Sequence, residues 1–215
     1  MIRMHRTVLI LLPALLLFTG CRSTYYAAME KVGVYKRDLL KKKVTAARDE
    51  QKEAGEQFTD ALTRLKKLYG FEGGNLEKLY NGLQSDYDAS AEKAVRVRQR
   101  VREVETVSAD LFREWERELQ QISTPALRDR SRQQLKETQE RYETLHTALK
   151  RAEQSMEPVL VQFRDHVLFL KHNLNAQAIA SLRGEATSIQ TEITKLLEEM
   201  NTAIRRADEF VKTLP

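Results

Sequence analysis

The chain has 215 residues, of which 31% are charged, and its formal net charge is +5. Its single cysteine excludes a disulfide-stapled domain, a zinc ribbon and an iron–sulfur site. The 8 glycines and 4 prolines are too few for a β-sandwich or a low-complexity linker, so the composition predicts long α-helices in one domain.

Residues 1–20 are typical of a secretory signal peptide, which is set aside before the fold is considered. Arg3 and Arg6 precede an uncharged run that is shorter than the roughly 20 apolar residues needed to span a bilayer. The run ends on a stretch that resembles the lipobox of bacterial lipoproteins, Leu17-Phe18-Thr19-Gly20-Cys21. Phe18 departs from this pattern, which prefers leucine at that position.

The lipobox resemblance implies that residues 1–20 are removed and that Cys21 carries the lipid at the start of the mature chain. Several acyl chains anchor a protein firmly, because each buried CH₂ group contributes about 0.8 kcal/mol. Arg22 stands where lipoproteins retained in the inner membrane carry aspartate. We therefore expect the protein to be anchored at the periplasmic face of the outer membrane of a Gram-negative bacterium. The alternative is a plain signal peptide, or an uncleaved anchor, with an incidental cysteine.

Positive charge is concentrated in residues 22–48, directly after the predicted anchor. This segment holds eight basic and two acidic residues, whereas the rest of the mature chain is net acidic. Basic residues beside a membrane are attracted to anionic headgroups by about 1 kcal/mol each, but a solvated helix face explains them equally well. The predicted membrane-proximal basic cluster comprises Lys31, Lys36, Arg37, Lys41, Lys42 and Lys43.

From Leu40 onward, apolar residues recur at spacings that alternate between four and three, which is a coiled-coil pattern. The first tract runs over residues 40–68, with Gln51 at its one polar core position, and stops at the glycine cluster around Gly73. Asn75 is the predicted cap of the second tract, which runs over residues 76–115. We expect its last member, Trp115, to be a core anchor.

Two further tracts follow. Thr124 and Pro125 form a cap and a first helical position ahead of the third tract, over residues 135–174. The fourth tract covers residues 179–214, and its phase is shifted by one residue from that of the third. A turn capped by Asn175 explains the shift better than a continuous helix with a stutter.

Tracts of this length correspond to helices of nearly 70 Å, at about 1.5 Å per residue. Because short turns make consecutive helices antiparallel, the predicted fold is all-α, an elongated antiparallel coiled coil or four-helix bundle over residues 37–215. Residues 21–36 connect the acylated N-terminus to it. The chain start and the C-terminus then share the membrane end, and the turns at Gly73 and Asn173 share the far end.

Two stretches carry a family resemblance. One begins the mature chain at Cys21 and includes Tyr25-Tyr26-Ala-Ala-Met29-Glu30-Lys31, and the other runs from Phe163 to Leu182. Both resemble the domain of unknown function family number 2959, and the resemblance covers essentially the whole mature chain. It implies a lipoprotein of a Gram-negative bacterium, and it implies no activity, ligand or catalytic residue.

Motifs for chemistry are sparse. Glu143 and His146 form one E-x-x-H motif, whereas di-iron bundles use two such motifs and two further glutamates. The basic run over residues 93–102 lacks the aromatic residues expected of nucleic-acid binding, and we expect it to pair with acidic residues of a neighbouring helix. We therefore predict no catalytic residue, no metal, no cofactor and no nucleic-acid partner.

The segment Arg164-Asp165-His166, together with Lys171-His172-Asn173, is the most informative polar set, because the apolar residues around it, between Val159 and Leu170, exceed what one coiled-coil seam needs. The favoured explanation is a helix central to its own bundle, and the alternative is a surface that faces a partner. The residues of this possible partner surface are Arg164, Asp165, His166, Lys171, His172 and Asn173.

These observations favour a non-enzymatic structural or partner-binding lipoprotein of the periplasm. Its expected partners are the membrane, through the acyl chains, and an unidentified envelope protein or the cell wall; a second copy of the chain, in a homo-oligomer, is a further candidate. The second hypothesis is a lipid-binding or membrane-remodelling helical protein. An enzyme is the least favoured of the three, for want of a constellation of reactive side chains.

Overall fold

The computed structural model describes Tyr26, Met29 and residues 33–214. The chain divides into two units, Met1–Lys36 and Arg37–Pro215, and the second contains the helical bundle. Cys21 and Lys31, which carry the predicted anchor and part of the predicted basic cluster, lie outside the described residues.

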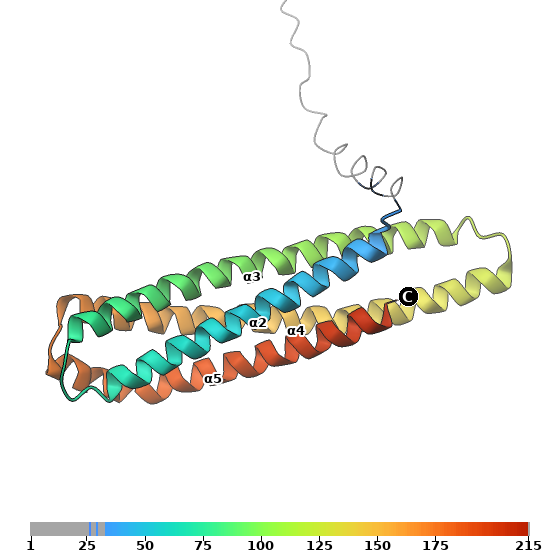
Figure 1. Cartoon of the computed structure of the whole chain (residues 1–215). Helices are drawn as coiled ribbons and strands as arrows, with labels where there is room; N and C mark the ends of the chain where they lie inside the picture. Colours follow the sequence, from blue (N-terminus) through green and yellow to red (C-terminus); the bar gives the residue numbers. More distant parts are fainter. Residues whose placement is uncertain (1–25, 27–28, 30–32, 215) are drawn as a thin grey trace, which may run out of the picture. The chain divides into compact units, whose positions relative to one another are not determined.

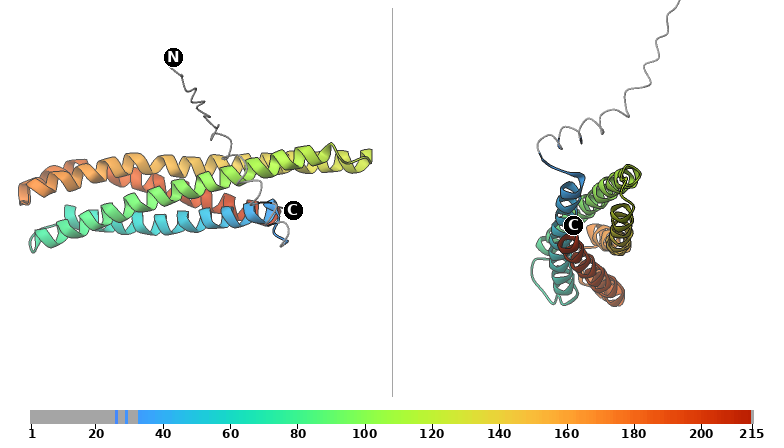
Figure 2. Two further views of the ribbon diagram at one scale, coloured as in Figure 1. Left: turned by 90° about the horizontal axis from the view of Figure 1, so that it is seen from above. Right: turned by 90° about the vertical axis from the view of Figure 1, so that its right-hand side faces the viewer.

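Four long helices make up the bundle: α2 (Lys36–Tyr69), α3 (Leu76–Leu119), α4 (Pro125–His172) and α5 (Ala176–Thr213). Consecutive helices run antiparallel and surround one core (Figures 1 and 2). No strand occurs in the part of the chain that the structure describes. The predicted all-α, four-helix bundle is therefore confirmed.

Local chemistry sets the helix boundaries. The side chain of Asn75 accepts a hydrogen bond from the Lys78 amide at 2.8 Å, and that of Asn175 accepts one from the Ala178 amide at 2.9 Å. These bonds satisfy amides that have no partner inside the helix. Thr124 occupies the predicted cap position but makes no side-chain bond to α4. The turn before α5 confirms that the third and fourth tracts are separate helices.

The predicted heptad positions form the core. Along α2, the apolar members of the stripe are at most 1% exposed, namely Leu40, Val44, Ala47, Ala54, Phe58, Ala61, Leu65 and Leu68. Burial of apolar surface contributes about 25 cal/mol per Å², so these stripes hold the four helices together. Pro158 lies inside α4, on the exposed side of the helix, and the helix continues beyond it.

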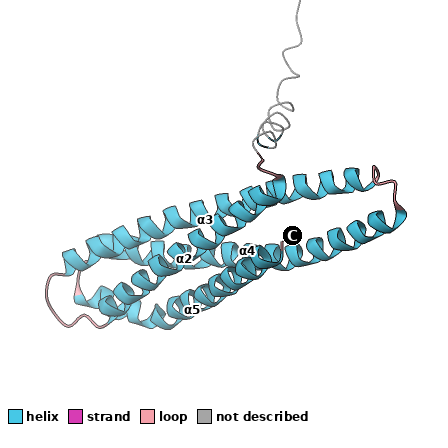
Figure 3. Ribbon diagram, turned by 45° about the vertical axis from the view of Figure 1, so that its right-hand side comes forward, coloured by secondary structure: helices cyan, strands magenta, loops and turns pink. Residues whose placement is uncertain are grey.

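The helices differ in length. α3 has 44 residues and α4 has 48, against 34 in α2 and 38 in α5. The α3–α4 hairpin therefore extends beyond the other two helices (Figure 3). Trp115 lies near the end of α3, is only half-buried, and donates from Nε1 to Ser131 Oγ at 2.9 Å. Trp115 is therefore not the expected core anchor. It is a contact between α3 and α4, in a segment of the hairpin that α2 and α5 do not reach.

Candidate functional site

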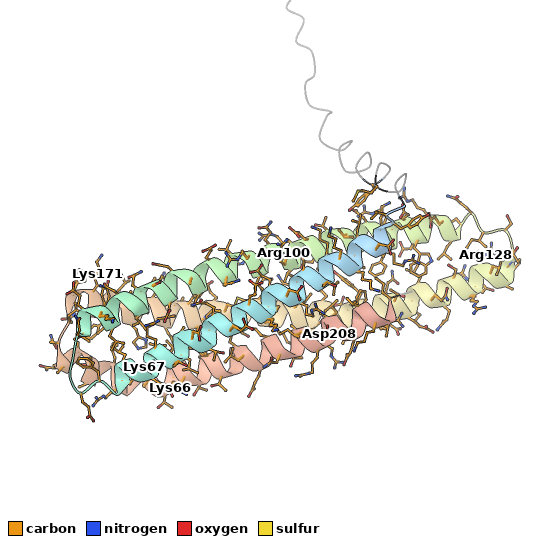
Figure 4. All side chains as sticks on the ribbon, viewed as in Figure 1. Lys66, Lys67, Arg100, Arg128, Lys171 and Asp208 are labelled. Atoms are coloured by element: carbon orange, nitrogen blue, oxygen red, sulfur yellow. The ribbon has the colours of Figure 1, made fainter. Side chains whose placement is uncertain are left out.

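The turns after α2 and α4 lie at the same end of the bundle, as predicted, and we call this the far end. Arg183 of α5 reaches across to the α2–α3 turn, where its Nη2 donates to the Phe71 carbonyl at 3.2 Å. Figure 4 shows Lys66, Lys67 and Lys171 at this end and Arg128 at the other. Segments separated by a hundred residues thus contribute to one surface.

The structure divides the predicted partner surface. Arg164, Asp165, Lys171 and His172 are exposed, and Arg164 Nε lies 3.8 Å from Asp165 Oδ1. Asn173 serves the end of α4 instead, because its side-chain amide donates to the Phe169 carbonyl at 3.0 Å.

His166 does not belong to that surface, so this part of the prediction is wrong. His166 is 5% exposed, and its ring is oriented edge-on to the Tyr69 ring of α2, with 6.2 Å between the ring centroids. The position follows Phe163 by three residues and precedes Leu170 by four, which places it on the core side of α4. Burial lowers the pKa of His166, and Nδ1 has no hydrogen-bond partner.

Exposed apolar side chains are concentrated beside these polar residues. Of the seven large hydrophobic residues exposed among those the structure describes, four lie in residues 161–174. They form what we call the far-end apolar patch: Val161 (37% exposed), Leu168 (49%), Phe169 (40%) and Leu174 (41%). The wide apolar face predicted from the sequence is therefore only partly used by the bundle core.

The predicted membrane-proximal basic cluster is also divided. Lys36 is 8% exposed, with Nζ 4.6 Å from the centroid of the Tyr26 ring. Lys43 pairs with Glu103 of α3 at 3.0 Å. Burial alone would raise the pKa of Glu103, but hydrogen bonds led by that from Lys43 outweigh it and hold this pKa below its usual range.

The remaining members of the cluster are on the surface. Arg37 lies 3.7 Å from the neighbouring Asp38, whereas Lys41 and Lys42 are exposed and form no ion pair with any described residue. Among the described members of the cluster, Lys41 and Lys42 are therefore available to an anionic surface.

The basic run of α3 pairs with acidic residues on neighbouring helices, as predicted. Glu50 of α2 is 8% exposed and accepts from Arg96 at 3.0 Å and from Lys93 at 3.4 Å. Arg98 lies 3.4 Å from Glu153 of α4. These arginines and lysines hold helices together.

The E-x-x-H motif is a surface feature of α4. His146 Nε2 lies 2.8 Å from Glu105 Oε1 of α3, and Glu143 is exposed beside an open groove between α4 and α5. Among the described residues, no three histidine, cysteine or acidic side chains gather as a metal site would require.

Comparison with known proteins places the chain in one family. A family model described as "Protein of unknown function (DUF2959)" matches residues 25–214. Neither the curated proteins nor the solved structures include a match. Within the described residues, no helix has the length and apolar character needed to cross a membrane.

Proposed function

The chain belongs to the DUF2959 family of proteins of unknown function, and we propose that it is an envelope lipoprotein that binds a partner through its far end. In this proposal Cys21 carries the lipid, the outer membrane holds the protein, and the bundle extends into the periplasm. The role is structural, and no catalytic step is assigned to the chain.

The anchor is supported by the sequence around Cys21. The only cysteine of 215 residues stands at the end of an uncharged run, directly after two small residues. Lys41 and Lys42, exposed in the second turn of α2, follow within the next 21 residues of chain. A lipid chain together with nearby basic residues is a common combination for stable anchoring.

The far-end apolar patch is the observation that carries the partner-binding role. Leu168 and Phe169 expose 49% and 40% of their surfaces, whereas the core side of the same helix is formed by other apolar residues, such as Phe163, Val167 and Leu170. Exposed apolar area has a free-energy cost of about 25 cal/mol per Å² relative to burial. Such clusters on a soluble surface usually mark a contact, and the charged groups of Arg164 and Lys171 beside it would give that contact direction.

Two experiments in cells test the proposal. Replacement of Cys21 with serine should block lipid attachment and release the protein from the membrane fraction; normal maturation and unchanged membrane attachment would contradict the anchor. A photo-crosslinking residue at Phe169 should trap a partner, whereas the same residue at Val95, which is 57% exposed on α3, should not.

Charge reversal at the far end completes the test. The double variant Arg164→Glu with Lys171→Glu should keep its helicity and melting temperature, because both side chains are exposed, and should lose the Phe169 crosslink. If the variant unfolds, or if its crosslinks persist, this surface has a structural role and the assignment is wrong.

A further inference from the structure

We propose that the far end docks on an anionic lipid surface, so that the protein links its anchoring membrane to a second bilayer surface. The inference rests on the proposed function and names the chemical class of the partner. It uses the far-end apolar patch together with lysines that only the folded chain brings to the same end.

The apolar part of this surface reaches the tip of the bundle. Leu174 lies between two asparagines in the turn that joins α4 to α5, and it is 41% exposed. Asn173 ends α4 and Asn175 caps α5 through their own groups. Leu174 directly precedes this cap, a position where an apolar residue often packs against the first turns of the helix, but much of its side chain here stays on the surface. An apolar side chain at the tip of a rod is placed to enter the boundary between headgroups and acyl chains.

Three lysines beside the tip form no ion pair within the described chain. Lys66 and Lys67 are exposed in the last turn of α2, and Lys171 is exposed in the last turn of α4. Figure 4 shows all three at one end of the bundle. Near an anionic bilayer each basic residue contributes about 1 kcal/mol of attraction.

Acidic residues also lie near this end. Glu72 and Glu77 lie in the α2–α3 turn and the first turn of α3, Asp165 has Arg164 beside it, and Glu185 of α5 lies within electrostatic range of the buried His166. Lysines in the last turn of a helix also offset the helix dipole. Stability and vesicle binding must therefore be measured separately. If these lysines only offset the helix dipole, replacing them should change stability and leave vesicle binding unchanged.

A second copy of the chain is a poorer occupant of this surface. Arg164 and Lys171 are seven residues apart, so they lie on the same flank of α4. If α4 packed antiparallel on α4 of another copy about a two-fold axis, this basic flank would face itself. A surface rich in phosphate offers the opposite charge without such a conflict.

The length of α2 separates the far end from the start of the bundle. α2 has 34 residues and therefore spans about 50 Å. This exceeds the Debye length of about 8 Å at physiological salt. Charges at the start of α2, Lys41 and Lys42 among them, therefore have little effect on how the far-end lysines interact with a charged surface.

Vesicle capture tests the inference with the lipidated full-length chain. The protein is anchored in donor vesicles of phosphatidylcholine and mixed with labelled acceptor vesicles. These contain either phosphatidylcholine alone or an equimolar mixture with phosphatidylglycerol. Capture of the anionic acceptors alone, lost in concentrated salt, is the expected result. Equal capture of both kinds of acceptor, or of neither, would overturn the proposal.

Two sets of variants locate the contact. The triple variant Lys66→Glu, Lys67→Glu and Lys171→Glu should reduce capture by about tenfold or more, and so should Leu174→Asp. The matched control, Lys52→Glu with Lys195→Glu, changes exposed lysines in the middle of α2 and of α5 and should leave capture unchanged. Unchanged capture by both far-end variants, with their melting temperatures preserved, would refute the site.

The test separates this inference from the function on which it rests. Co-sedimentation of the unlipidated Cys21→Ser chain with anionic vesicles, compared with and without the far-end triple substitution, measures the far end without the lipid anchor, so a failed anchor does not hide a lipid contact. If Phe169 crosslinks to an envelope protein while anionic vesicles are not captured, the partner-binding role stands and the lipid surface is wrong.

Discussion

Gln51 offers the sharpest test of how the bundle core is built. It occupies a core position of α2 between Ala47 and Ala54 and is 0% exposed. Neither its amide nitrogen nor its amide oxygen has a hydrogen-bond partner. Leaving a polar group buried without a partner costs about 1–3 kcal/mol. The Gln51 side chain therefore lowers the free energy of unfolding.

Replacement of Gln51 with methionine removes this cost and nearly conserves side-chain volume. We expect the free energy of unfolding to rise by about 2 kcal/mol, from the lost polar penalty and the added apolar burial. In a chain of this size that change corresponds to about 4–8 °C in melting temperature. Urea unfolding and thermal melting, both followed by circular dichroism, measure the two quantities.

The control for this experiment is Gln57→Met on the same helix. Gln57 is half-buried and its amide donates to the Asp86 carbonyl at 3.4 Å, so its replacement should bring no gain. If Gln51→Met leaves stability unchanged or lowers it while the control behaves as expected, the buried amide is already satisfied and the reasoning fails.

Two other predictions concern glycine and pH. Gly82→Ala should bring the bundle no net gain in urea titrations, because a Cβ there would lie 2.5 Å from Arg64 Nη1 and displace that guanidinium from Asp86, which offsets the helix-propensity gain of about 0.5–1 kcal/mol. In contrast, Gly55→Ala should stabilise it by about 0.5–1 kcal/mol, since its Cβ would meet Met200 Sδ at an ordinary 3.7 Å; a loss there would contradict the packing. Burial lowers the pKa of His166 below its unfolded value of 6.5, so the unfolded chain binds the extra proton and stability falls as pH drops through 6.5. The urea midpoint of His166→Phe should vary less across this window, and an unchanged pH dependence would show that the ring is not titrating in the core.

Helix boundaries were within reach of the sequence because short-range chemistry determines them. The glycine cluster around Gly73 ends α2, Pro125 begins α4, and the caps Asn75 and Asn175 begin α3 and α5. Each signal acts within a few residues of chain, through a backbone angle or one hydrogen bond. The heptad stripes were equally readable, because the direction of a side chain around its own helix follows from its position alone.

Other features depended on distances between helices. A heptad pattern specifies which side of α4 is apolar, but it does not specify that Tyr69 of α2 stands opposite His166. Nor does it specify the axial offset between helices, which leaves Trp115 half-buried in a two-helix segment. Such contacts depend on the relative rotation and translation of four helices, and no single stripe contains that information.

The candidate site shows the same division. The surplus of apolar residues between Val159 and Leu170 was visible in the sequence, because it is a property of a single helix. The packing of the four helices then leaves Leu168 and Phe169 on the surface and covers His166. The common end of Lys66, Lys67 and Lys171 followed from the predicted antiparallel order of the helices, whereas their exposure there, with no ion pair to any described residue, came from the structure. The physical reason is that exposure and surface charge depend on which helices cover a face, and that is settled by packing.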